Sequence, residues 1–510
     1  MADAKRSLPS HVLKEVDLSL CKTFKVPSLY PDQLDALRNF LCGSDVFVNK
    51  PTGFGKSIIF QMAPFAEMAL AKHITQYKVW RDSAILIVIC PLIALMKDQV
   101  NRLQELGISA AYVGSDQSNS VLNKIENGEY GLVFMSPEST LDNERWRSMI
   151  SNPLHSKSLM GIAVDDVHCV THWGQSNGNH ERAAFRKWYS RLNELRSITE
   201  GIPFMALTAT ATTSTKRKIF DLLEMKKPYE VVASPDRGIV SFVVQKMEND
   251  CSLIDHFQCI ISEIQLKGKH SMRTIIYFQT ILQCSMVYNL LANKLGNDMY
   301  LSNDQKPQER LIEMMHSQTA SNVKDHVLHQ FSQRGGHLRV LVATIAFGMG
   351  VNCQGVRRVI HFGPSKTIEA YIQESGRCGR DGEESYAVLL YNGIMIRTTN
   401  DDMKDYFKGK DVCRREGLLK HFGGNVSVKP SGHMCCDRCA ETCTCKGKYC
   451  DMDVYLPVGQ LYNDMDVAIN SRQVAENKLE QLRARFWQMQ KAMVLGEGSR
   501  GISHVTYQLL

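Results

Sequence analysis

The stretch Val46-Phe-Val-Asn-Lys-Pro-Thr-Gly-Phe-Gly-Lys-Ser57 contains the pattern from which the fold can be inferred. Its apolar start at Val46–Val48 predicts a buried strand, its glycines predict a tight turn, and the residues that follow are typical of a helix. Such a turn lets backbone N–H groups surround phosphate oxygens, while Lys56 reaches the β and γ phosphates and Ser57 binds Mg²⁺. We therefore expect a phosphate-binding loop whose nucleotide contacts are Thr52, Gly53, Phe54, Gly55, Lys56 and Ser57.

Short apolar runs recur along the chain and predict the remaining strands of two sheets. They lie at Ala84–Ile89, Leu132–Met135, Gly161–Val164, Phe204–Leu207, Thr274–Phe278, Arg339–Ala343 and Arg358–His361. Longer helix-compatible stretches separate these runs, as in the crossover units of parallel sheets. The segment Ala233–Gly238 lies between the first set and the second, and it predicts a hinge between two α/β domains in series.

Length and composition exclude several classes of protein. A chain of 510 residues with 44% hydrophobic and 22% charged residues is ordinary for a multidomain globular protein. The longest apolar run, Ala84–Met96, is interrupted by Pro91 and is too short to span a bilayer. No apolar signal segment follows Met1, so secretion is not expected. The net charge of +7 permits a polyanionic partner without requiring one.

The block Gly161-Ile-Ala-Val-Asp-Asp-Val-His168 predicts the chemical partner of the phosphate loop. An apolar strand that ends in Asp165 places a carboxylate where it can hold Mg²⁺. The next carboxylate, Asp166, is a candidate for orienting the attacking water, and His168 is a candidate for sensing the nucleotide. We expect these three side chains beside the loop.

A cysteine cluster predicts a metal site. Seven of the 16 cysteines lie within Cys413–Cys450, and Cys436-x-x-Cys439 has the spacing of a metal knuckle. Reduced thiolates favour tetrahedral Zn²⁺. Spacing alone leaves His433 and Cys435 as alternatives for one ligand. The remaining thiols are expected to be free or, together with His433, to form a second site; they are Cys443, Cys445 and Cys450.

Further blocks occur in a fixed order along the chain. They are Cys90-Pro-Leu-Ile-Ala-Leu-Met-Lys-Asp-Gln99, Ser136-Pro-Glu138, Ala206-Leu-Thr-Ala-Thr-Ala211, Ala343-Thr-Ile-Ala-Phe-Gly-Met-Gly350 and Gln373-Glu-Ser-Gly-Arg-Cys-Gly-Arg-Asp-Gly382. With Gln33 ahead of the loop, they resemble the RecQ family of superfamily 2 DNA helicases, especially its eukaryotic members, across residues 28–440.

The resemblance implies two tandem RecA-like parallel-sheet domains followed by a small helical zinc-binding module. The implied boundaries are a first helicase domain at 1–235, a second at 236–400, the zinc module at 401–450 and a helical tail at 451–510. Within the tail, Leu479, Leu482, Phe486, Met489 and Met493 predict one amphipathic helix. We find no match to the winged-helix domain that family members often add, so the duplex-opening wedge is not expected.

The resemblance also implies roles for individual residues. Gln33 would read the adenine edge, although Tyr30 stands where the family usually has an arginine. Arg377 and Arg380 would reach the phosphates from the second domain, and Arg380 is similar to the family's arginine finger. At Asp166 the family normally has glutamate. The implied zinc ligands are Cys413, Cys435, Cys436 and Cys439.

The family tracks one DNA strand across both domains, which implies DNA contacts at Pro91, Leu92, Ser136, Trp173 and Thr344. The position of Trp173 resembles the start of the family's aromatic-rich loop, which would continue at Phe185 and Arg186 after an unusually long insertion. The alternative is that Trp173 is a buried residue with a packing role only. The implied cofactors are ATP, Mg²⁺ and Zn²⁺, and the implied partners are single-stranded and partially duplex DNA.

The sequence thus predicts an ATP-dependent helicase that moves 3′ to 5′ on single-stranded DNA and unwinds duplexes in recombination, repair or replication. The leading alternative is a DNA-binding or strand-annealing protein with weakened ATPase activity. A third candidate function is that of an RNA helicase. The cysteine cluster and the Gln373–Arg377 block argue against it. A nuclear location is expected from the eukaryotic resemblance alone.

Overall fold

The computed structural model describes residues 8–73, 80–169, 187–247, 252–344, 353–409, 413–423, 430 and 432–443, and the structural statements below concern these residues. Residues Met1–Met452 form one compact unit. The predicted tail at 451–510, with its amphipathic helix, lies outside the described residues. Within the described part, none of the helices has the length and apolar character that crossing a bilayer requires.

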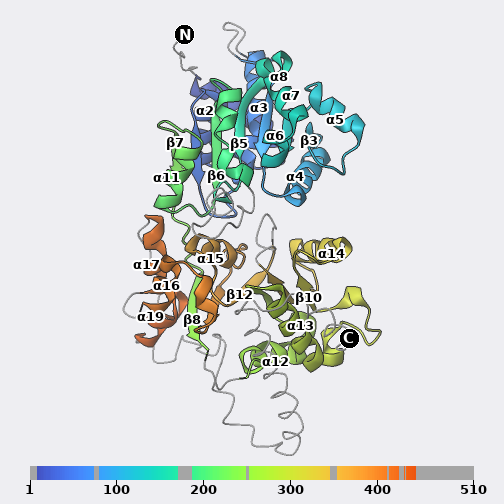
Figure 1. Cartoon of the computed structure of the whole chain (residues 1–510), viewed down its shortest axis with the longest axis vertical. Helices are drawn as coiled ribbons and strands as arrows, with labels where there is room; N and C mark the ends of the chain where they lie inside the picture. Colours follow the sequence, from blue (N-terminus) through green and yellow to red (C-terminus); the bar gives the residue numbers. More distant parts are fainter. Residues whose placement is uncertain are drawn as a thin grey trace, which may run out of the picture. The chain divides into compact units, whose positions relative to one another are not determined.

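The first sheet has seven strands, all parallel, in the order β3-β4-β2-β5-β6-β1-β7. Figure 1 shows β3 and β7 on opposite sides of this sheet. The strands are β1 (Val46–Asn49), β2 (Ile85–Ile89), β3 (Ala110–Tyr112), β4 (Leu132–Met135), β5 (Leu159–Val164), β6 (Phe204–Thr208) and β7 (Tyr229–Val232). The strand runs predicted in this half of the chain are confirmed, whereas β3 and β7 were not predicted. Next to the edge strand β7, Val48 of β1 lies between Leu207 of β6 and Val231 of β7.

Helices cover both faces of the first sheet, because parallel strands point successive side chains to opposite sides. In β1, Val46 and Val48 belong to one hydrophobic core and Phe47 to the other. The first core is closed by α1 (Ser10–Thr23), α2 (Pro31–Leu41), α3 (Lys56–His73) and α4 (Ile93–Glu105). The second is closed by α5 (Asn119–Glu126), α6 (Pro137–Leu141), α7 (Glu144–Ser151), α10 (Glu194–Ile198) and α11 (Thr213–Leu222). The short α8 (Pro153–Ser158) precedes β5.

The second sheet has six parallel strands in the order β10-β11-β9-β12-β13-β8. They are β8 (Val240–Lys246), β9 (Arg273–Phe278), β10 (Ile312–Met315), β11 (Val340–Thr344), β12 (Val356–Phe362) and β13 (Ser385–Tyr391). Its helices are α12 (Gln258–Lys267), α13 (Ile281–Leu295), α14 (Ser321–Ser332) and α15 (Ile368–Ser375). The predicted strands β9, β11 and β12 are confirmed, whereas β8, β10 and β13 were not predicted. The linker Ala233–Gly238 lies between β7 and β8, as the hinge prediction requires.

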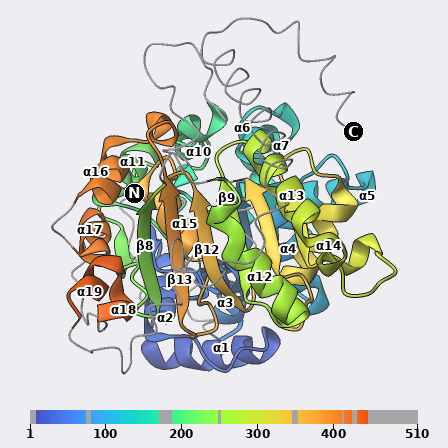
Figure 2. The same cartoon turned by 90° about the horizontal axis from the view of Figure 1, so that it is seen from below.

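A helical module follows the second sheet and packs on its edge strand β8 (Figure 2). It consists of α16 (Asp401–Lys408), α17 (Arg414–Leu419), α18 (Gly432–Cys435) and α19 (Asp437–Glu441). Side-chain hydrogen bonds attach it to β8: Ser241 Oγ donates to Met434 O at 2.9 Å, Val244 N donates to Asp437 Oδ2 at 3.1 Å, and Arg415 donates to Val240 O. Short 3₁₀ turns complete the structure: η1 (Lys187–Arg191), η2 (Asp255–Phe257), η3 (Gly268–His270), η4 (Gly296–Met299), η5 (Pro307–Glu309), η7 (Met395–Thr398) and η8 (Lys420–Phe422).

Candidate nucleotide site and cysteine cluster

The glycine-rich loop connects the end of β1 to the start of α3. Gly53 and Gly55 have φ angles of +92° and +79°, a region that residues with a Cβ atom rarely adopt. The ammonium group of Lys56 donates to the carbonyl oxygens of Lys50 at 2.8 Å and Pro51 at 3.3 Å. The loop therefore has the strand–turn–helix geometry of a phosphate-binding loop, and its lysine faces the concave backbone.

Gln33 of α2 supports this loop directly. Its side-chain Nε2 donates to Phe54 O at 2.7 Å and to Gly55 O at 3.2 Å, while its Oε1 accepts a hydrogen bond from Tyr30 N at 2.8 Å. A Cβ atom at residue 55 would lie 2.8 Å from Gln33 Nε2 and would displace this amide, and the φ of +79° itself favours glycine there. The amide of Gln33 is thus engaged with the loop backbone, and its expected contact with adenine stays a prediction. Tyr30 stacks on Phe54 with ring centroids 5.8 Å apart.

The predicted acidic pair and histidine follow β5 beside the loop. Asp165 is buried, and its Oδ1 accepts a hydrogen bond from the backbone N–H of Asp166 at 3.0 Å. Asp166 has a φ angle of +48°, a left-handed conformation that aspartate tolerates better than most residues. His168 is buried, with Nδ1 3.2 Å from the hydroxyl of Thr208 at the end of β6.

Burial dominates the electrostatics of these groups. It raises the pKa of Asp165 to about 7, assisted by the charge of Asp166 and opposed by that of Lys56. Burial lowers the pKa of Lys56 to about 8, against the attraction of the two aspartates. It also lowers the pKa of His168. The negative charges of Asp165 and Asp166 both raise the pKa of Lys56, so the three charged groups lie in one site.

The donor set at this site fits a magnesium ion. Mg²⁺ prefers oxygen ligands, usually one or two carboxylates completed by phosphate oxygens and water. Asp165 supplies a carboxylate, and Ser57 supplies a hydroxyl at the first turn of α3. The amide of Gln99 in α4 donates to Ser57 Oγ at 3.3 Å, which orients that hydroxyl. These oxygens are of the kind that would hold Mg²⁺ against a bound triphosphate.

The arginines predicted from the second domain are near the phosphate loop. Arg377 and Arg380 follow α15, and Arg377 is 3% exposed. Burial lowers the pKa of Arg380 to about 10, and the charges of Arg377 and Arg237 act in the same direction. The positive charge of Arg380 also lowers the pKa of Lys56. Cations from two sheets therefore lie close enough to repel one another around one loop.

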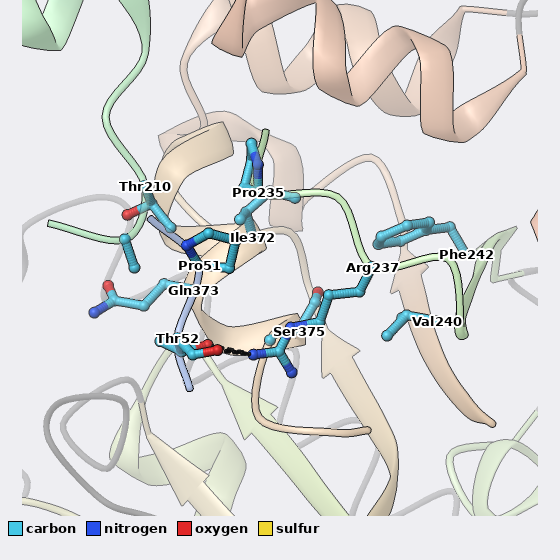
Figure 3. A pocket seen from close by; sticks show the side chains of 12 residues that line it. Pro51, Thr52, Thr210, Pro235, Arg237, Val240, Phe242, Ile372, Gln373 and Ser375 are labelled. Atoms are coloured by element: carbon cyan, nitrogen blue, oxygen red, sulfur yellow. Dashed lines mark hydrogen bonds between the residues drawn. The ribbon is translucent and has the colours of Figure 1, made fainter. Parts of the chain in front are cut away.

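Two further contacts connect the sheets at this place. Glu369 Oε1 of α15 accepts hydrogen bonds from Thr212 Oγ1 and Thr215 Oγ1, each at 2.9 Å, at the N-terminus of α11. The guanidinium group of Arg237 donates to Thr52 Oγ1 at 2.7 Å (Figure 3). It also donates to Cys378 O at 3.2 Å. The structure thus joins the phosphate loop to the segment that carries the two arginines.

The residues expected to contact DNA follow the carboxyl ends of parallel strands. Pro91 and Leu92 follow β2 after Cys90, Ser136 lies directly after β4, and Thr344 ends β11. Ser136 caps α6 by accepting a hydrogen bond from Ser139 N at 3.1 Å. In the first sheet, these positions share one edge with the phosphate loop, since parallel strands end on the same side. Trp173, Phe185 and Arg186 lie outside the described residues.

The cysteine cluster brings its implied ligands together. The sulfur atoms of Cys413, Cys435, Cys436 and Cys439 all lie within 4.8 Å of one another. Hydrogen bonds from Cys435 and Cys436 hold the pKa of the Cys413 thiol well below its ordinary value. Four clustered sulfur ligands are the donor set of a structural zinc site, so the residues fit Zn²⁺. Cys443 does not belong to this group of four, and Cys445, Cys450 and the side chain of His433 lie outside the described part of the chain.

Several residues of the site were not predicted. Arg237 lies in the predicted hinge, and no role was predicted for the pair Asp236-Arg237 beyond connecting the two domains. Gln99 is the last residue of the block that begins at Cys90, and Glu369 precedes the block that begins at Gln373. Their signal in the sequence is weak, because a polar side chain near a motif is usually solvated.

Two parallel sheets in series, with a phosphate loop at the end of one and arginines supplied from the other, define a two-domain RecA-like fold. Residues 30–219 match the family model described as DEAD/DEAH box helicase, and residues 255–382 match the one described as helicase conserved C-terminal domain. The match to solved structures agrees: the DUF1998 helicase MrfA bound to DNA has a TM-score of 0.57 at 17% identity, covering 76% of this chain and 52% of that one. At that identity the likeness concerns the fold alone.

Curated relatives place the chain more narrowly. It is 30% identical over 457 residues to the ATP-dependent DNA helicase hus2/rqh1 of Schizosaccharomyces pombe, which covers 84% of this chain and 31% of the relative. It is 29% identical over 453 residues to the ATP-dependent DNA helicase Q1 of Rattus norvegicus, which covers 84% of this chain and 64% of the relative. The chain belongs to the RecQ family of helicases. It spans less than two thirds of the length of these relatives.

Proposed function

We propose that this chain is an ATP-dependent DNA helicase that translocates 3′ to 5′ on single-stranded DNA and unwinds duplex DNA. The observation that carries the proposal is the arrangement of Lys56, Asp165 and Arg380 around one phosphate loop. Lys56 and Asp165 come from the first sheet, and Arg380 comes from the second. A site shared between two domains is what a motor needs, because each domain can then respond to the state of the nucleotide.

The charges around the loop favour a polyanion. Burial lowers the pKa of both Lys56 and Arg380, which means that each cation costs free energy to keep charged there. Phosphate oxygens would restore the lost solvation and separate the repelling cations. We infer that Lys56 exchanges its contacts with the carbonyls of Lys50 and Pro51 for the β and γ oxygens of ATP.

The remaining side chains divide the hydrolysis between them. Ser57 and Asp165 would hold Mg²⁺, which neutralises the developing phosphate charge when it is bound. Asp166 would orient the attacking water and take its proton, and His168 would sense the nucleotide beside it. Arg377 and Arg380 would stabilise charge on the phosphoryl group in transfer.

The domain organisation proposed for this mechanism follows the predicted boundaries. Residues 1–235 form the ATP-binding domain and residues 236–400 the second helicase domain. The zinc module spans 401–450, and 451–510 form a tail of unassigned role. Zn²⁺ would be held by Cys413, Cys435, Cys436 and Cys439, and its binding energy would stabilise a module with little core of its own.

DNA is proposed to cross the strand ends that also carry the loop. Backbone amides and hydroxyls at such positions can hold phosphates without reading bases. Contacts at Pro91, Leu92, Ser136 and Thr344 would couple the strand to both sheets, and Trp173 is proposed as a stacking contact. The names of the relatives support DNA over RNA, as does the cysteine cluster. The proposed partners are single-stranded and partially duplex DNA. The proposed setting is recombination, repair or replication of DNA in the nucleus.

A second candidate function is a DNA-binding or strand-annealing protein with weakened ATPase activity. It is favoured by one observation, namely Asp166 at a position where the family normally has glutamate. Strand displacement separates the two candidates. A partial duplex with a 3′ tail should be opened only when ATP is present, whereas the annealing protein would join complementary strands and leave that duplex intact.

A further inference from the structure

Arg237 of the linker forms hydrogen bonds to both halves of the proposed ATP site. Its Nη2 donates to Thr52 Oγ1 at 2.7 Å and also to Thr52 O (Figure 3). Its Nη1 donates to Cys378 O at 3.2 Å. Cys378 directly follows Arg377 and lies two residues before Arg380. One planar guanidinium group thus connects the phosphate loop to the segment that carries both arginines.

A second arginine fixes the linker on which Arg237 lies. Arg415 is fully buried, and its guanidinium donates to Asp236 Oδ1, to Arg237 O at 2.9 Å and to Val240 O. It also lies over the ring of Phe242, 5.4 Å from the centroid. A buried guanidinium needs acceptors for its donors, and here backbone oxygens and the Asp236 carboxylate accept from both Nη atoms, whereas Nε has no acceptor among the described residues. Arg415 therefore fixes the chain on both sides of the Arg237 α-carbon.

Arg415 belongs to the helical module rather than to either sheet. It lies in the first turn of α17, two residues after Cys413 of the cysteine cluster. The neighbouring Arg414 donates to Asp437 Oδ1 at 3.1 Å, and Asp437 lies between Cys436 and Cys439. An uninterrupted series of hydrogen bonds and short chain segments therefore runs from the cysteine cluster through Arg415 and Arg237 to Thr52.

We propose that Arg237 is a positioning residue for ATP hydrolysis and that Arg415 of the helical module holds it in place. The proposal rests on the ATPase function proposed above. Arg237 does not need to touch the nucleotide. It keeps the backbone at Cys378 against the phosphate loop, so that Arg377 and Arg380 remain at the phosphates despite their mutual repulsion. The module thereby acts on the ATP site through the linker.

This role predicts a defect in turnover rather than in nucleotide binding. The loop, Lys56 and Asp165 hold the nucleotide from the first sheet. Arg237 contacts the loop at Thr52, whereas Gln33 supports the loop backbone at Phe54 and Gly55. Displacing catalytic groups by about 1 Å costs on the order of a hundredfold in rate. Lysine cannot replace the arginine, because a single ammonium group does not match the two separated acceptors, Thr52 and Cys378.

The test compares Arg237→Ala, Arg237→Lys, Arg415→Ala and the Arg237→Ala/Arg415→Ala double variant, with Arg334→Ala as an exposed arginine control. The kcat and KM for ATP are measured with saturating single-stranded DNA, together with affinity for a fluorescent ADP analogue and zinc content. We expect Arg237→Ala and Arg237→Lys to lower kcat at least about tenfold, with KM and ADP affinity changed less than about threefold. The control should match wild type.

The double variant tests whether Arg415 acts through Arg237. If it does, the double variant loses no more kcat than Arg237→Ala alone, because the effects of coupled residues do not add. Multiplied losses would overturn that part of the proposal. Should Arg415→Ala fail to fold or lose zinc, Asp236→Asn takes its place, since it removes only the anionic acceptor.

The outcome for wild type separates the two levels of inference. Hydrolysis by wild type together with an unaffected kcat in Arg237→Ala overturns the positioning role and leaves the proposed function intact. A loss of ADP affinity equal to the loss of kcat would also overturn it, because Arg237 would then serve binding. No hydrolysis by wild type would contradict the proposed function and this inference with it.

Discussion

Asp166 Oδ1 lies 4.0 Å from His168 Nδ1, across the turn that follows β5. That distance is too long for a hydrogen bond, and Nδ1 is 3.2 Å from the hydroxyl of Thr208 instead. Asp166 also adopts a left-handed backbone conformation, with φ at +48°. The carboxylate proposed to orient water therefore occupies a constrained turn with a short side chain.

Asp166→Glu tests whether that side chain limits turnover. Glutamate is longer by one methylene, which advances the oxygens by roughly 1–1.5 Å, and misplacement on that scale costs on the order of a hundredfold in rate. We expect kcat with saturating single-stranded DNA to rise, with ADP affinity unchanged. Asp166→Asn serves as the control and should bind nucleotide without turnover. An equal or lower kcat in the glutamate variant would mean that the turn is built around aspartate, which tolerates positive φ better.

The lowered pKa of Lys56 predicts a pH dependence of nucleotide binding. With a pKa of about 8 in the free protein, Lys56 loses its charge as the pH rises past that value. A bound nucleotide favours the charged form and raises the pKa, so affinity is full below 8 and falls above it, by up to about tenfold per pH unit. Binding of ADP without Mg²⁺, measured from pH 8 to 9.5, where Asp165 with its pKa of about 7 is already ionised, should show this fall. The Lys56→Arg variant stays charged, so its ADP affinity should not fall over this pH range. A flat profile for wild type would contradict the assignment of Lys56 as the lysine that binds the phosphates.

The cysteine cluster predicts one tightly held Zn²⁺ per chain, measured by elemental analysis of protein purified without chelator. Cys436→Ser or Cys439→Ser should lose the metal and destabilise residues 405–445, because ligand binding energy is folding energy in a small module. Cys443→Ser is the matched control, since Cys443 does not belong to the group of four, and it should retain zinc. Absence of zinc from wild type would refute the site, and two zinc ions per chain would assign ligands to the remaining cysteines.

Polarity and salt dependence can be measured together on partial duplexes. Displacement should require a 3′ single-stranded tail, and it should weaken steeply as salt rises, because phosphate contacts release counterions. Blunt duplexes of the same length are the control and should remain closed. Efficient opening from a 5′ tail alone would contradict the proposed direction of movement.

The central strands could be predicted from the sequence because they are buried on both faces. In β2, Ile85–Ile89, each residue is buried, and the apolar run is continuous. The edge strand β7 was missed for the opposite reason: Tyr229, Glu230 and Val232 are exposed, so no apolar run marks it. β10 was missed for another reason: Ile312 and Glu313 are both buried, but the acidic Glu313 interrupts the apolar run. β13 is apolar over most of its length, and its omission has no such cause.

The candidate site was predictable where its residues lie within one local motif. The turn at Gly53 and Gly55 and the residues after β5 depend on neighbours in sequence, so their pattern predicts their placement. The contact of Arg237 with Thr52 joins residues 185 positions apart, and that of Arg415 with Asp236 spans 179. No periodicity or spacing encodes such pairs. They become visible only when the fold brings buried arginines against the linker.

Hydrolysis of ATP with and without single-stranded DNA, measured on wild type and Lys56→Ala, tests the central claim most directly. We expect DNA to stimulate hydrolysis by wild type. The Lys56→Ala variant should be inactive with its melting temperature within about 2 °C of wild type, because only the cation at the β and γ oxygens is removed. Tight DNA binding by wild type without turnover, or wild-type turnover in a folded Lys56→Ala variant, would contradict the account.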